Sequence, residues 1–317
     1  MRAAFLDWGS VDANDLDASC LTGLPLEWVF FPKVSQPELD DLLAETTILV
    51  SNKVVLDAAH IERAGALRLV CVAATGTNNV DLTAAAKREI PVCNVTAYAT
   101  DSVVQHVFML LLNLVRQQPA YQEALAQGRW QRSQHFCFLD YSIESLAGKT
   151  LGIIGYGELG QAVASMAKHF GMHVLIAQSL HAQPRSDRVP LDDLLPQVDV
   201  LSLHCPLTTQ TRHLISAREF DLMKPSAILV NTARGGIVDE AALLQALDNK
   251  QIAAAALDVL AEEPPGQDHP LLQKRRHNLI ITPHIAWASR QARQKLIMGV
   301  ANNIDSWLKG KVTNRVN

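Results

Sequence analysis

Short apolar runs alternate with helix-like segments along most of this chain, and this alternation constrains the fold more than any other feature. In the first third of the chain the apolar runs are AAFLDW, LEWVFF, TILVS, LRLVCVAA and IPVCNV. The segments between them, such as ELDDLLAE and NVDLTAAAKRE, have the spacing of amphipathic helices. Strands that are apolar throughout must be covered on both faces, so the pattern predicts parallel strands sandwiched between helices.

A second alternating series begins at KTLGIIGYG and continues through HVLIAQ, VDVLSLH, AILVNTA, IAAAALDV and NLIITPH. A strongly apolar helix is expected between the two series, starting at Ser102, which forms the S-x-x-Q pattern of a capping box with Gln105. A long final helix closes the chain. We therefore predict an α/β protein of two doubly wound parallel-sheet domains: residues 1–98 with 289–317 form one, and a Rossmann-type domain, 99–288, is inserted into it.

Composition excludes several classes of protein. The chain has 317 residues, a formal charge of −4 and nearly half apolar residues, which indicates a globular protein with no electrostatic footprint for nucleic acid. No apolar run is long enough to span a membrane, and acidic residues come too early for a signal peptide. The five cysteines lack metal-ligand or disulfide spacing. We expect a cytoplasmic protein without a bound metal.

A glycine motif opens the second series. Gly155, Gly157 and Gly160 form G-x-G-x-x-G directly after an apolar strand and at the start of a helix. The first glycine permits a tight turn, the second lets a pyrophosphate approach the backbone, and the third lets helix and strand pack closely. The helix N-terminus favours the negative phosphates. The motif in this context predicts a dinucleotide cofactor, NAD or NADP.

The second strand of this series ends at Gln178, where an acidic residue would bind the ribose 2′-hydroxyl of NAD and repel a 2′-phosphate. Glutamine can donate a hydrogen bond to the ribose, but it carries no charge and does not repel a 2′-phosphate. Four residues that follow closely are able to contact a phosphate: Ser179, His181, Arg185 and Arg188. The choice between NAD and NADP therefore stays open.

Three charged or titratable residues follow later strands: Arg234, Glu263 and His284. Ligands of open α/β sheets bind beyond the carboxyl ends of the strands, which is where these side chains are expected. Hydride transfer to a ketone needs a proton donor, a role suited to His, and a neighbouring carboxylate favours its charged form. Arg binds a carboxylate through two parallel hydrogen bonds. Each residue alone could be structural; together they form a set for reducing a 2-oxo acid.

Five segments occur in the order and spacing typical of one family: GIIGYGELG, HCPLTTQTRHLI, NTARGGIVDE, AALDVLAEEPP and TPHIAW. The chain resembles the D-isomer-specific 2-hydroxyacid dehydrogenases over essentially its whole length. The resemblance implies that His284 is the acid/base, that Glu263 is its partner, and that Arg234 binds the carboxylate and carbonyl of the substrate. It also implies a homodimer formed through the cofactor domains.

The resemblance further implies roles for individual residues. AATGTNNVD resembles the loop whose amides hold the substrate carboxylate, which points to Thr75 and Gly76. Residues implied to lie by the cofactor are Glu158 and Leu159 at the pyrophosphate, Cys205 and Pro206 at the adenine, and Thr232, Ala233 and Asp258 at the nicotinamide, where Asp258 would bond the carboxamide. Gln178 departs from the acidic residue usual in the family.

SNKVVLD, ATGTNNVDL and HIAWAS most resemble the glycerate dehydrogenase (hydroxypyruvate reductase) branch, in which Lys53 and Trp287 would shape the pocket. The alternative for Trp287 is a packing role. The implied reaction is reduction of hydroxypyruvate or glyoxylate to D-glycerate or glycolate. Alternatives are a D-lactate-type or phosphoglycerate-type dehydrogenase and a nucleotide-sensing protein of the corepressor type. A formate dehydrogenase would have Gln in place of Glu263, and the longer substrate domain of an adenosylhomocysteinase-like hydrolase does not fit this length.

Overall fold

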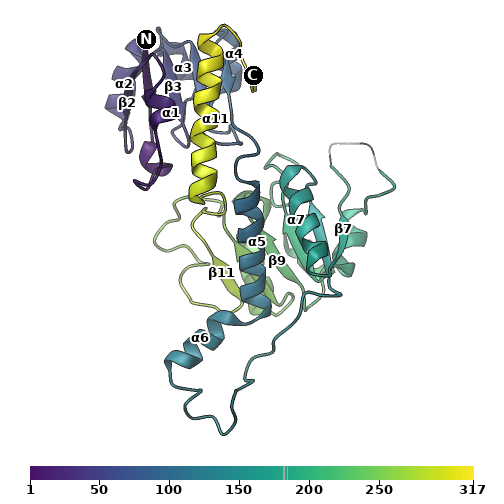
Figure 1. The fold of residues 1–317 in the computed structure, drawn as a ribbon. Helices are drawn as coiled ribbons and strands as arrows, with labels where there is room; N and C mark the ends of the chain where they lie inside the picture. The colour runs from purple at the N-terminus through teal and green to yellow at the C-terminus, as the bar shows by residue number, and fades with distance from the viewer. Residues whose placement is uncertain (181–182, 184) are drawn as a thin grey trace. The chain divides into compact units, whose positions relative to one another are not determined.

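The computed structural model describes residues 1–180, 183 and 185–317 and divides the chain into two compact units (Figure 1). The terminal unit comprises Met1–Ala99 and Trp287–Asn317, and the central unit comprises Thr100–Ala286. Each unit is built on one parallel sheet, as expected from the alternating strands and helices.

The sheet of the terminal unit has the order β2-β1-β3-β4-β5, which is the flavodoxin-like order. All its strand pairs are parallel. The strands are β1 (Arg2–Phe5), β2 (Glu27–Phe30), β3 (Ile48–Ser51), β4 (Leu69–Val72) and β5 (Val92–Cys93). The helices are α1 (Ser19–Thr22), α2 (Gln36–Glu45), α3 (Ala58–Arg63), α4 (Leu82–Lys87) and α11 (Arg290–Leu308), with a 3-10 turn at Trp8–Ser10.

Helices cover both faces of this sheet because successive strand residues point to opposite sides. In β4, for example, Val70 packs in one apolar cluster and Cys71 in the other. The first cluster takes its helical residues from α2, α3 and α4, and the second takes them from α1 and α11. Strands buried on both faces explain why the apolar runs are continuous rather than alternating.

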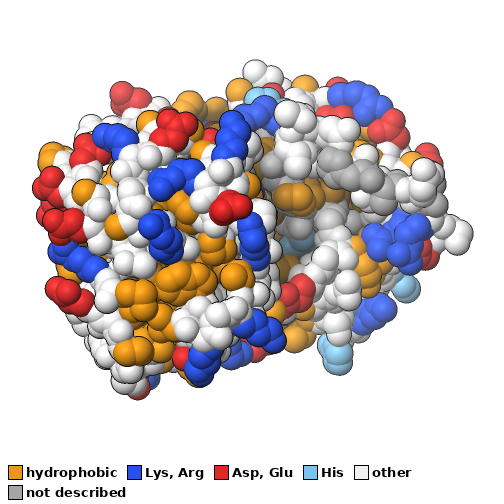
Figure 2. All heavy atoms as spheres, turned by 90° about the horizontal axis from the view of Figure 1, so that it is seen from above, with side chains coloured by type: hydrophobic (Ala, Val, Ile, Leu, Met, Phe, Trp, Pro, Cys, Tyr) orange, Lys and Arg blue, Asp and Glu red, His pale blue; other side chains and the backbone are white. Residues whose placement is uncertain are grey.

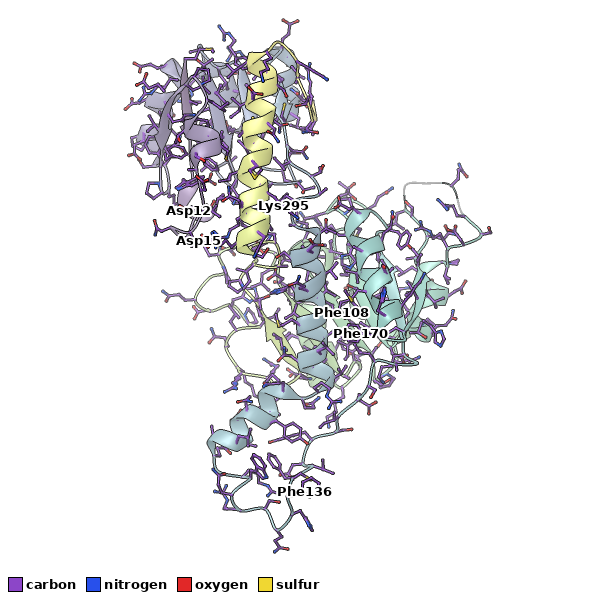
Figure 3. All side chains as sticks on the ribbon, viewed as in Figure 1. Asp12, Asp15, Phe108, Phe136, Phe170 and Lys295 are labelled. Atoms are coloured by element: carbon purple, nitrogen blue, oxygen red, sulfur yellow. The ribbon has the colours of Figure 1, made fainter. Side chains whose placement is uncertain are left out.

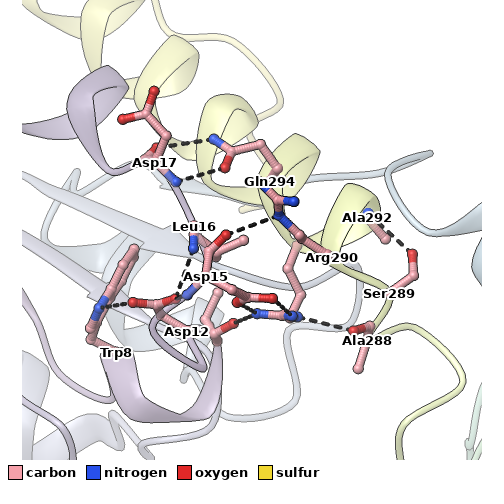
Figure 4. Close-up of polar contacts among 12 residues, drawn as sticks. Trp8, Asp12, Asp15, Leu16, Asp17, Ala288, Ser289, Arg290, Ala292 and Gln294 are labelled. Carbon is pink, nitrogen blue, oxygen red and sulfur yellow. Dashed lines mark hydrogen bonds and ion pairs between the residues drawn. The ribbon is translucent and has the colours of Figure 1, made fainter.

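Polar contacts fix the start of α11 against the segment that follows β1. Arg293 forms a two-bond ion pair with Asp15, with both N···O distances at 2.7 Å. Gln294 exchanges two hydrogen bonds with the backbone of Asp17 (Figure 4). The final helix therefore belongs to the same unit as the N-terminal strands.

The sheet of the central unit has the order β11-β10-β9-β8-β6-β7, and all its pairs are parallel. The strands are β6 (Thr150–Ile154), β7 (His173–Ile176), β8 (Val200–Leu203), β9 (Ile228–Asn231), β10 (Ala254–Leu257) and β11 (Leu279–Ile281). An isolated parallel bridge, Ala177 to Val189, lies beyond β7, where a Rossmann sheet would have its outer strand. The order matches that fold.

The helices of the central unit are α5 (Thr100–Val115), α6 (Gln118–Ala126), α7 (Glu158–His169), α8 (Leu191–Leu194), α9 (Ala217–Leu222) and α10 (Glu240–Asp248), with 3-10 turns at Leu195–Gln197 and Gly235–Ile237. The apolar cluster on one face of the sheet takes its helical residues from α8, α9 and α10. Helix α5 contacts β9 and β10, and α7 contacts β6 and β7. Phe108 of α5 stacks on Phe170, 4.9 Å between ring centroids (Figure 3).

The prediction of a capping box at Ser102 is wrong. Helix α5 begins at Thr100, so Ser102 lies within its first turn, and its hydroxyl donates to the carbonyl of Ala286 at 2.7 Å. The helix is also less uniformly apolar than the sequence indicated: Gln105 and Met109 are exposed on one side. A tertiary partner for the serine hydroxyl has replaced the local cap.

Residues 128–145, here called the arm, contain no helix or strand and follow α6 at one end of the central unit (Figure 1). Arg129 forms a two-bond ion pair with Asp140, and the Trp130 indole donates to the carbonyl of Phe136 at 2.8 Å. Phe136 is 91% exposed and lies far out on the arm (Figure 3). The arm thus has internal order but leaves large apolar side chains in solvent.

Among the described residues, no helix is both long enough and apolar enough to cross a membrane. On the face shown in Figure 2, acidic and basic side chains are interspersed, in keeping with the small net charge of −4.

Candidate active site

The three ends of β9, β10 and β11 lie side by side, because Asn231, Leu257 and Ile281 are paired in register. Arg234, Glu263 and His284 follow these strand ends by three, six and three residues. The structure therefore places all three at the carboxyl edge of one sheet, where ligands of doubly wound folds bind.

His284 and Glu263 are in direct contact. The Nδ1 atom of His284 lies 2.6 Å from Oε2 of Glu263, and their side chains are 24% and 34% exposed. The other carboxylate oxygen, Oε1, accepts a hydrogen bond from the amide of Leu260 at 2.9 Å. Glu263 is thus held by its own turn, and it contacts the imidazole of His284 through Nδ1.

Asp258 shapes the turn that presents His284. Its carboxylate accepts from the Thr282 hydroxyl at 2.6 Å and from the amides of Ile285 and Ala286 at 2.9 and 2.8 Å. The amide of His284 donates to the carbonyl of Asp258 at 2.8 Å. Burial acts to raise the pKa of Asp258, but hydrogen bonds from His106, Thr282 and the two amides outweigh it and hold the pKa below its usual value.

This network bears on the expected contact between Asp258 and the nicotinamide carboxamide. Asp258 is 1% exposed, and both of its carboxylate oxygens already accept hydrogen bonds. The sequence had not pointed to a role in holding His284, or to the support from His106, whose Nε2 lies 2.9 Å from the Thr282 hydroxyl. The polar Thr282 directly before Pro283-His284 was the available signal. The carboxamide contact stays a prediction.

Arg234 lies in a turn that Asn231 holds from within. The Asn231 side chain, fully buried, donates to the carbonyl of Arg234 at 2.8 Å and accepts from the amide of Ala233 at 3.0 Å. The guanidinium donates to the carbonyl of Ala233 at 2.7 Å. Across the part of the chain that is described, Arg234 has no carboxylate partner, so this cation is left with most of its donors for an incoming anion.

Gly235 brings the Arg234 turn against the Glu263 turn. A Cβ atom at Gly235 would overlap the backbone of Leu260 and Ala261, whereas one at Gly236 would meet the Leu207 side chain at 3.3 Å. Leu260 is the residue whose amide binds Glu263. The two glycines therefore differ: only the first permits the close approach of backbone to backbone.

Gly235→Ala is accordingly expected to lower the free energy of unfolding by about 3 kcal/mol, since the overlap is with backbone rather than a movable side chain. Gly236→Ala, its matched control, should change stability by less than about 1 kcal/mol. Urea unfolding followed by circular dichroism measures both. Equal stabilities for the two variants would contradict the close approach.

The glycine motif has the geometry expected for a dinucleotide. Gly155 has φ +90°, and a Cβ there would crowd the backbone of His204 and Cys205. A Cβ at Gly160 would overlap the carbonyl of Gly155. At Gly157, the N-cap of α7, a Cβ would meet nothing within 4 Å. Packing therefore requires the first and third glycines, while the open space at Gly157 fits a pyrophosphate.

The residues expected on the nicotinamide side include one unsatisfied polar atom. Within the described chain, the buried hydroxyl oxygen of Thr232 has no hydrogen-bond partner. Buried hydroxyls are rarely left without a partner, so a bound ligand at this position would satisfy it. Together with the space at Gly157, this orphan hydroxyl shows that the residues present fit a dinucleotide. Ala233 follows it in the same turn, partly exposed.

Other predicted cofactor residues are placed as follows. Glu158 and Leu159 open α7, and Glu158 bonds the Thr100 hydroxyl. Cys205 is buried after β8, where burial raises the pKa of its thiol to about 11, and Pro206 is exposed beside it. These positions leave their contacts with the cofactor as predictions.

Gln178 is already bonded to the loop that follows it. Its amide nitrogen donates to the carbonyl of Arg185 at 2.8 Å, and its oxygen accepts from the amide of the same residue at 3.1 Å. Arg188 lies over the ring of Tyr156, inside the glycine motif, 4.7 Å from the centroid. Arg185 pairs with Asp187. His181, also named as a possible phosphate ligand, lies outside the described residues.

The imidazole of His204, next to Gly155, contacts the Ser202 hydroxyl at 2.9 Å. The residue retains partial solvent exposure, but burial of its ring lowers its pKa from 6.5 to about 4. As the pH falls, the unfolded chain binds a proton at His204 near pH 6.5, whereas the folded chain binds it only near pH 4. Stability should therefore fall as the pH drops from 6.5 towards 4, by up to about 1.4 kcal/mol per pH unit.

We expect His204→Gln to show a smaller loss of stability than the parent over this range, because glutamine keeps a polar partner for Ser202 without binding a proton. Urea unfolding at pH 7.5, 6.5 and 5.5 measures the difference. Parallel losses in the two proteins would show that His204 does not contribute.

In the terminal unit, the predicted carboxylate loop follows β4. The Thr75 hydroxyl donates to the carbonyl of Val95 at 3.1 Å. As far as the chain is described, the backbone amides of Thr75 and Gly76 donate to no protein acceptor. The amide of Lys53 donates to buried Asp7 at 2.6 Å. Trp287 stands edge-on to Tyr98, 6.3 Å between centroids, and packs against the apolar cluster under α11.

Comparison with known proteins gives a consistent result. Residues 108–286 match the model of the D-isomer specific 2-hydroxyacid dehydrogenase NAD binding domain. The chain is 41% identical to a glycerate dehydrogenase of Methylorubrum extorquens over 99% of its length and 98% of the relative's. It is 36% identical to a hydroxypyruvate reductase of Blautia hydrogenotrophica over the full length of both. An acyclic imino acid reductase solved with NADPH and D-Arg superimposes with a TM-score of 0.88 at 27% identity, over all of both chains.

Proposed function

Because this chain belongs to the D-isomer-specific 2-hydroxyacid dehydrogenases, NAD(P)-dependent oxidoreductases acting on CH–OH donors, we propose that it reduces hydroxypyruvate or glyoxylate to the corresponding 2-hydroxy acid, D-glycerate or glycolate. The names of two relatives, glycerate dehydrogenase and hydroxypyruvate reductase, favour this substrate class. The observation that carries the proposal is the set at the sheet edge: an Arg without an ion-pair partner in the described chain, and a His–Glu pair.

His284 donates the proton to the carbonyl oxygen as it becomes an alkoxide. Glu263 binds Nδ1 and orients the ring, so that Nε2 would face the substrate and serve as the proton donor. Bound NAD(P)H supplies the hydride. In the reverse direction, the same imidazole accepts the hydroxyl proton.

Two groups bind the carboxylate of the substrate in this proposal. The Arg234 guanidinium offers two parallel hydrogen bonds to carboxylate and carbonyl oxygens. The amides of Thr75 and Gly76, which donate to no acceptor in the described chain, supply the rest. Charge-assisted bonds of this kind fix the ketone relative to the proton donor, which is how positioning contributes to rate.

The cofactor would be held by Gly155, Gly157, Glu158, Leu159 and Gly160 at the pyrophosphate, by Cys205 and Pro206 at the adenine, and by Thr232, Ala233 and Asp258 at the nicotinamide. Use of NADP is supported by the absence of an acidic side chain at Gln178 and by Arg188, whose stacking on Tyr156 keeps a cation beside the glycine motif. Arg188→Ala should lower the affinity for NADPH but not the affinity for NADH. Arg185 is an exposed residue nearby, and Arg185→Ala should change both affinities little.

The experiment that tests the function is a comparison of kcat/KM for hydroxypyruvate, glyoxylate and pyruvate, each with NADH and NADPH. Hydroxypyruvate or glyoxylate should be preferred. A preference for pyruvate would indicate a D-lactate-type enzyme. Tight cofactor binding without turnover of any 2-oxo acid would refute the proposal in favour of a nucleotide-sensing protein, and a strong NADH preference would refute the role given to Arg188.

A homodimer is also part of the proposal. Among the large apolar side chains that the arm exposes, Trp130, Phe136 and Leu139 are 54%, 91% and 77% exposed, and such clustering marks a protein contact. A second copy of the chain is the partner implied by the family. Light scattering should give twice the chain mass, and Phe136→Ser with Leu139→Ser should reduce it. The five free cysteines favour a reducing, cytoplasmic location.

A further inference from the structure

The carboxylate loop of the terminal unit is tied to the segment that follows β5. Three hydrogen bonds join the two. The Asn94 side chain donates to the carbonyl of Thr75 at 2.7 Å, the Thr75 hydroxyl donates to the carbonyl of Val95 at 3.1 Å, and the amide of Val95 donates to the carbonyl of Ala74 at 3.2 Å. The conformation of this loop therefore depends on residues about twenty positions away.

The bond from Asn94 controls the direction of a second group. The carbonyl of Thr75 and the amide of Gly76 belong to one peptide unit, which is planar and trans. A donor that fixes the carbonyl oxygen fixes the plane, so the Gly76 N–H points the opposite way. Asn94 thus sets the orientation of one of the two amides assigned to the substrate carboxylate.

The backbone of Asn94 is itself hydrogen-bonded to two further residues. Asn303 of α11 donates to the Asn94 carbonyl at 2.9 Å, and the amide of Asn94 donates to the carbonyl of Asn314 at 3.2 Å. Asn303 in turn accepts from the side chains of Asn314 and Thr313, at 2.7 and 3.3 Å. Each asparagine amide is therefore part of one connected network that runs from residues 313–314 to Thr75.

Burial of the Asn303 side chain costs free energy, which suggests that this residue has a role. It is 1% exposed, and its helix neighbours Val300, Ala301 and Ile304 belong to the apolar core. A buried amide is tolerated when its hydrogen bonds are made, yet an apolar residue of similar size would need none. Gly299 allows the close approach, since a Cβ there would lie 2.5 Å from a methyl group of Val95. Helix α11 therefore packs closely against residues 94–95.

We propose that Asn94 is a positioning residue for the substrate loop, and that Asn303 and Asn314 hold it in place. The network keeps the Gly76 amide aimed at the substrate carboxylate before substrate arrives, which lowers the cost of binding. This inference rests on the proposed function, in which the Thr75 and Gly76 amides bind that carboxylate.

Asn94→Asp tests the inference, because it keeps the shape but replaces the donor with an oxygen that repels the Thr75 carbonyl. We expect KM for hydroxypyruvate to rise about tenfold or more, with KM for NADPH changed less than about twofold. Hydrogen exchange of residues 74–77 in the substrate-free protein should accelerate. Asn314→Ala should give a smaller change in the same direction.

The matched control for Asn94→Asp is Asn113→Asp in the central unit, whose side chain also donates to a carbonyl at 2.7 Å. For Asn314→Ala the control is Lys311→Ala, an exposed residue of the same segment. Both controls should leave KM and loop exchange unchanged. If Asn94→Asp lowers stability generally, Asn303→Leu provides a second variant in which the core stays packed.

The outcomes separate this inference from the function on which it rests. Faster loop exchange with a raised hydroxypyruvate KM supports it. Unchanged exchange and KM in Asn94→Asp overturn it, and if Gly76→Val still raises KM, the substrate role of the loop stands. If exchange accelerates but neither Asn94→Asp nor Gly76→Val alters KM, the substrate role of the loop fails and the inference falls with it.

Discussion

The His284→Asn variant is expected to reduce hydroxypyruvate about 10³-fold more slowly than the parent, with nearly unchanged affinity for NADPH. The variant cannot donate a proton to the forming alkoxide, which is the step that the imidazole serves in our proposal. Asparagine is preferred to alanine because His284 has φ +54°, in the left-handed region, where asparagine is tolerated better than most residues. The turn held by Asp258 should therefore survive, and the loss can be assigned to chemistry.

Stopped-flow single-turnover kinetics measures this step apart from product release, and fluorescence titration measures NADPH affinity. Glu263→Gln is the companion variant: its side chain still accepts from the Leu260 amide but carries no charge beside the imidazole. We expect an intermediate loss, about 10- to 100-fold in kcat. A His284→Asn enzyme with near-parental kcat would show that another group donates the proton.

The position of the His284–Glu263 pair could be predicted from the sequence for a physical reason. Parallel strands end at one edge of a sheet, so residues just after successive apolar runs converge even when they are far apart in the chain. The predicted contact required only that Glu263 and His284 follow neighbouring strands. The structure brings them to 2.6 Å through the β10–β11 pairing.

Contacts that depend on the direction of a side chain could not be predicted from the sequence. Nothing in the sequence indicated that the Asp258 carboxylate binds the amides of Ile285 and Ala286, because the chain reverses after β11 and brings these donors over it. Ser102 showed a capping pattern, but the carbonyl of Ala286 gave its hydroxyl a better partner than the helix end. Periodicity predicts which residues share a face, and it does not predict which polar group reaches which.

The role of Asn94 was missed for the same reason. NVTAYAT follows a predicted strand and contains no charged residue, so nothing in the pattern separates Asn94 from an ordinary loop asparagine. Its importance comes from Asn303 and Asn314, more than 200 positions later in the chain. Only the docking of α11 on this sheet brings the three together.

Arg234→Ala should lower kcat/KM for hydroxypyruvate by about 10³-fold, since two charge-assisted hydrogen bonds to the substrate are lost and each contributes about 1.5–3 kcal/mol. Stability should change little, because in the described structure the guanidinium binds only the carbonyl of Ala233 and completes no ion pair. The turn itself depends on Asn231 and Gly235, which the substitution leaves in place. A large kinetic loss without unfolding is therefore the signature expected of a cation held for an anion.

Arg234→Lys separates charge from geometry. Lysine keeps the positive charge but offers a point donor in place of a planar fork, so kcat/KM should recover only in part, to about 10- to 100-fold below the parent. Steady-state kinetics of the three proteins and their thermal unfolding midpoints test both parts. If Arg234→Ala unfolds at a much lower temperature while the folded fraction retains parental kcat/KM, the arginine is a structural residue, and the substrate carboxylate must be bound by other groups.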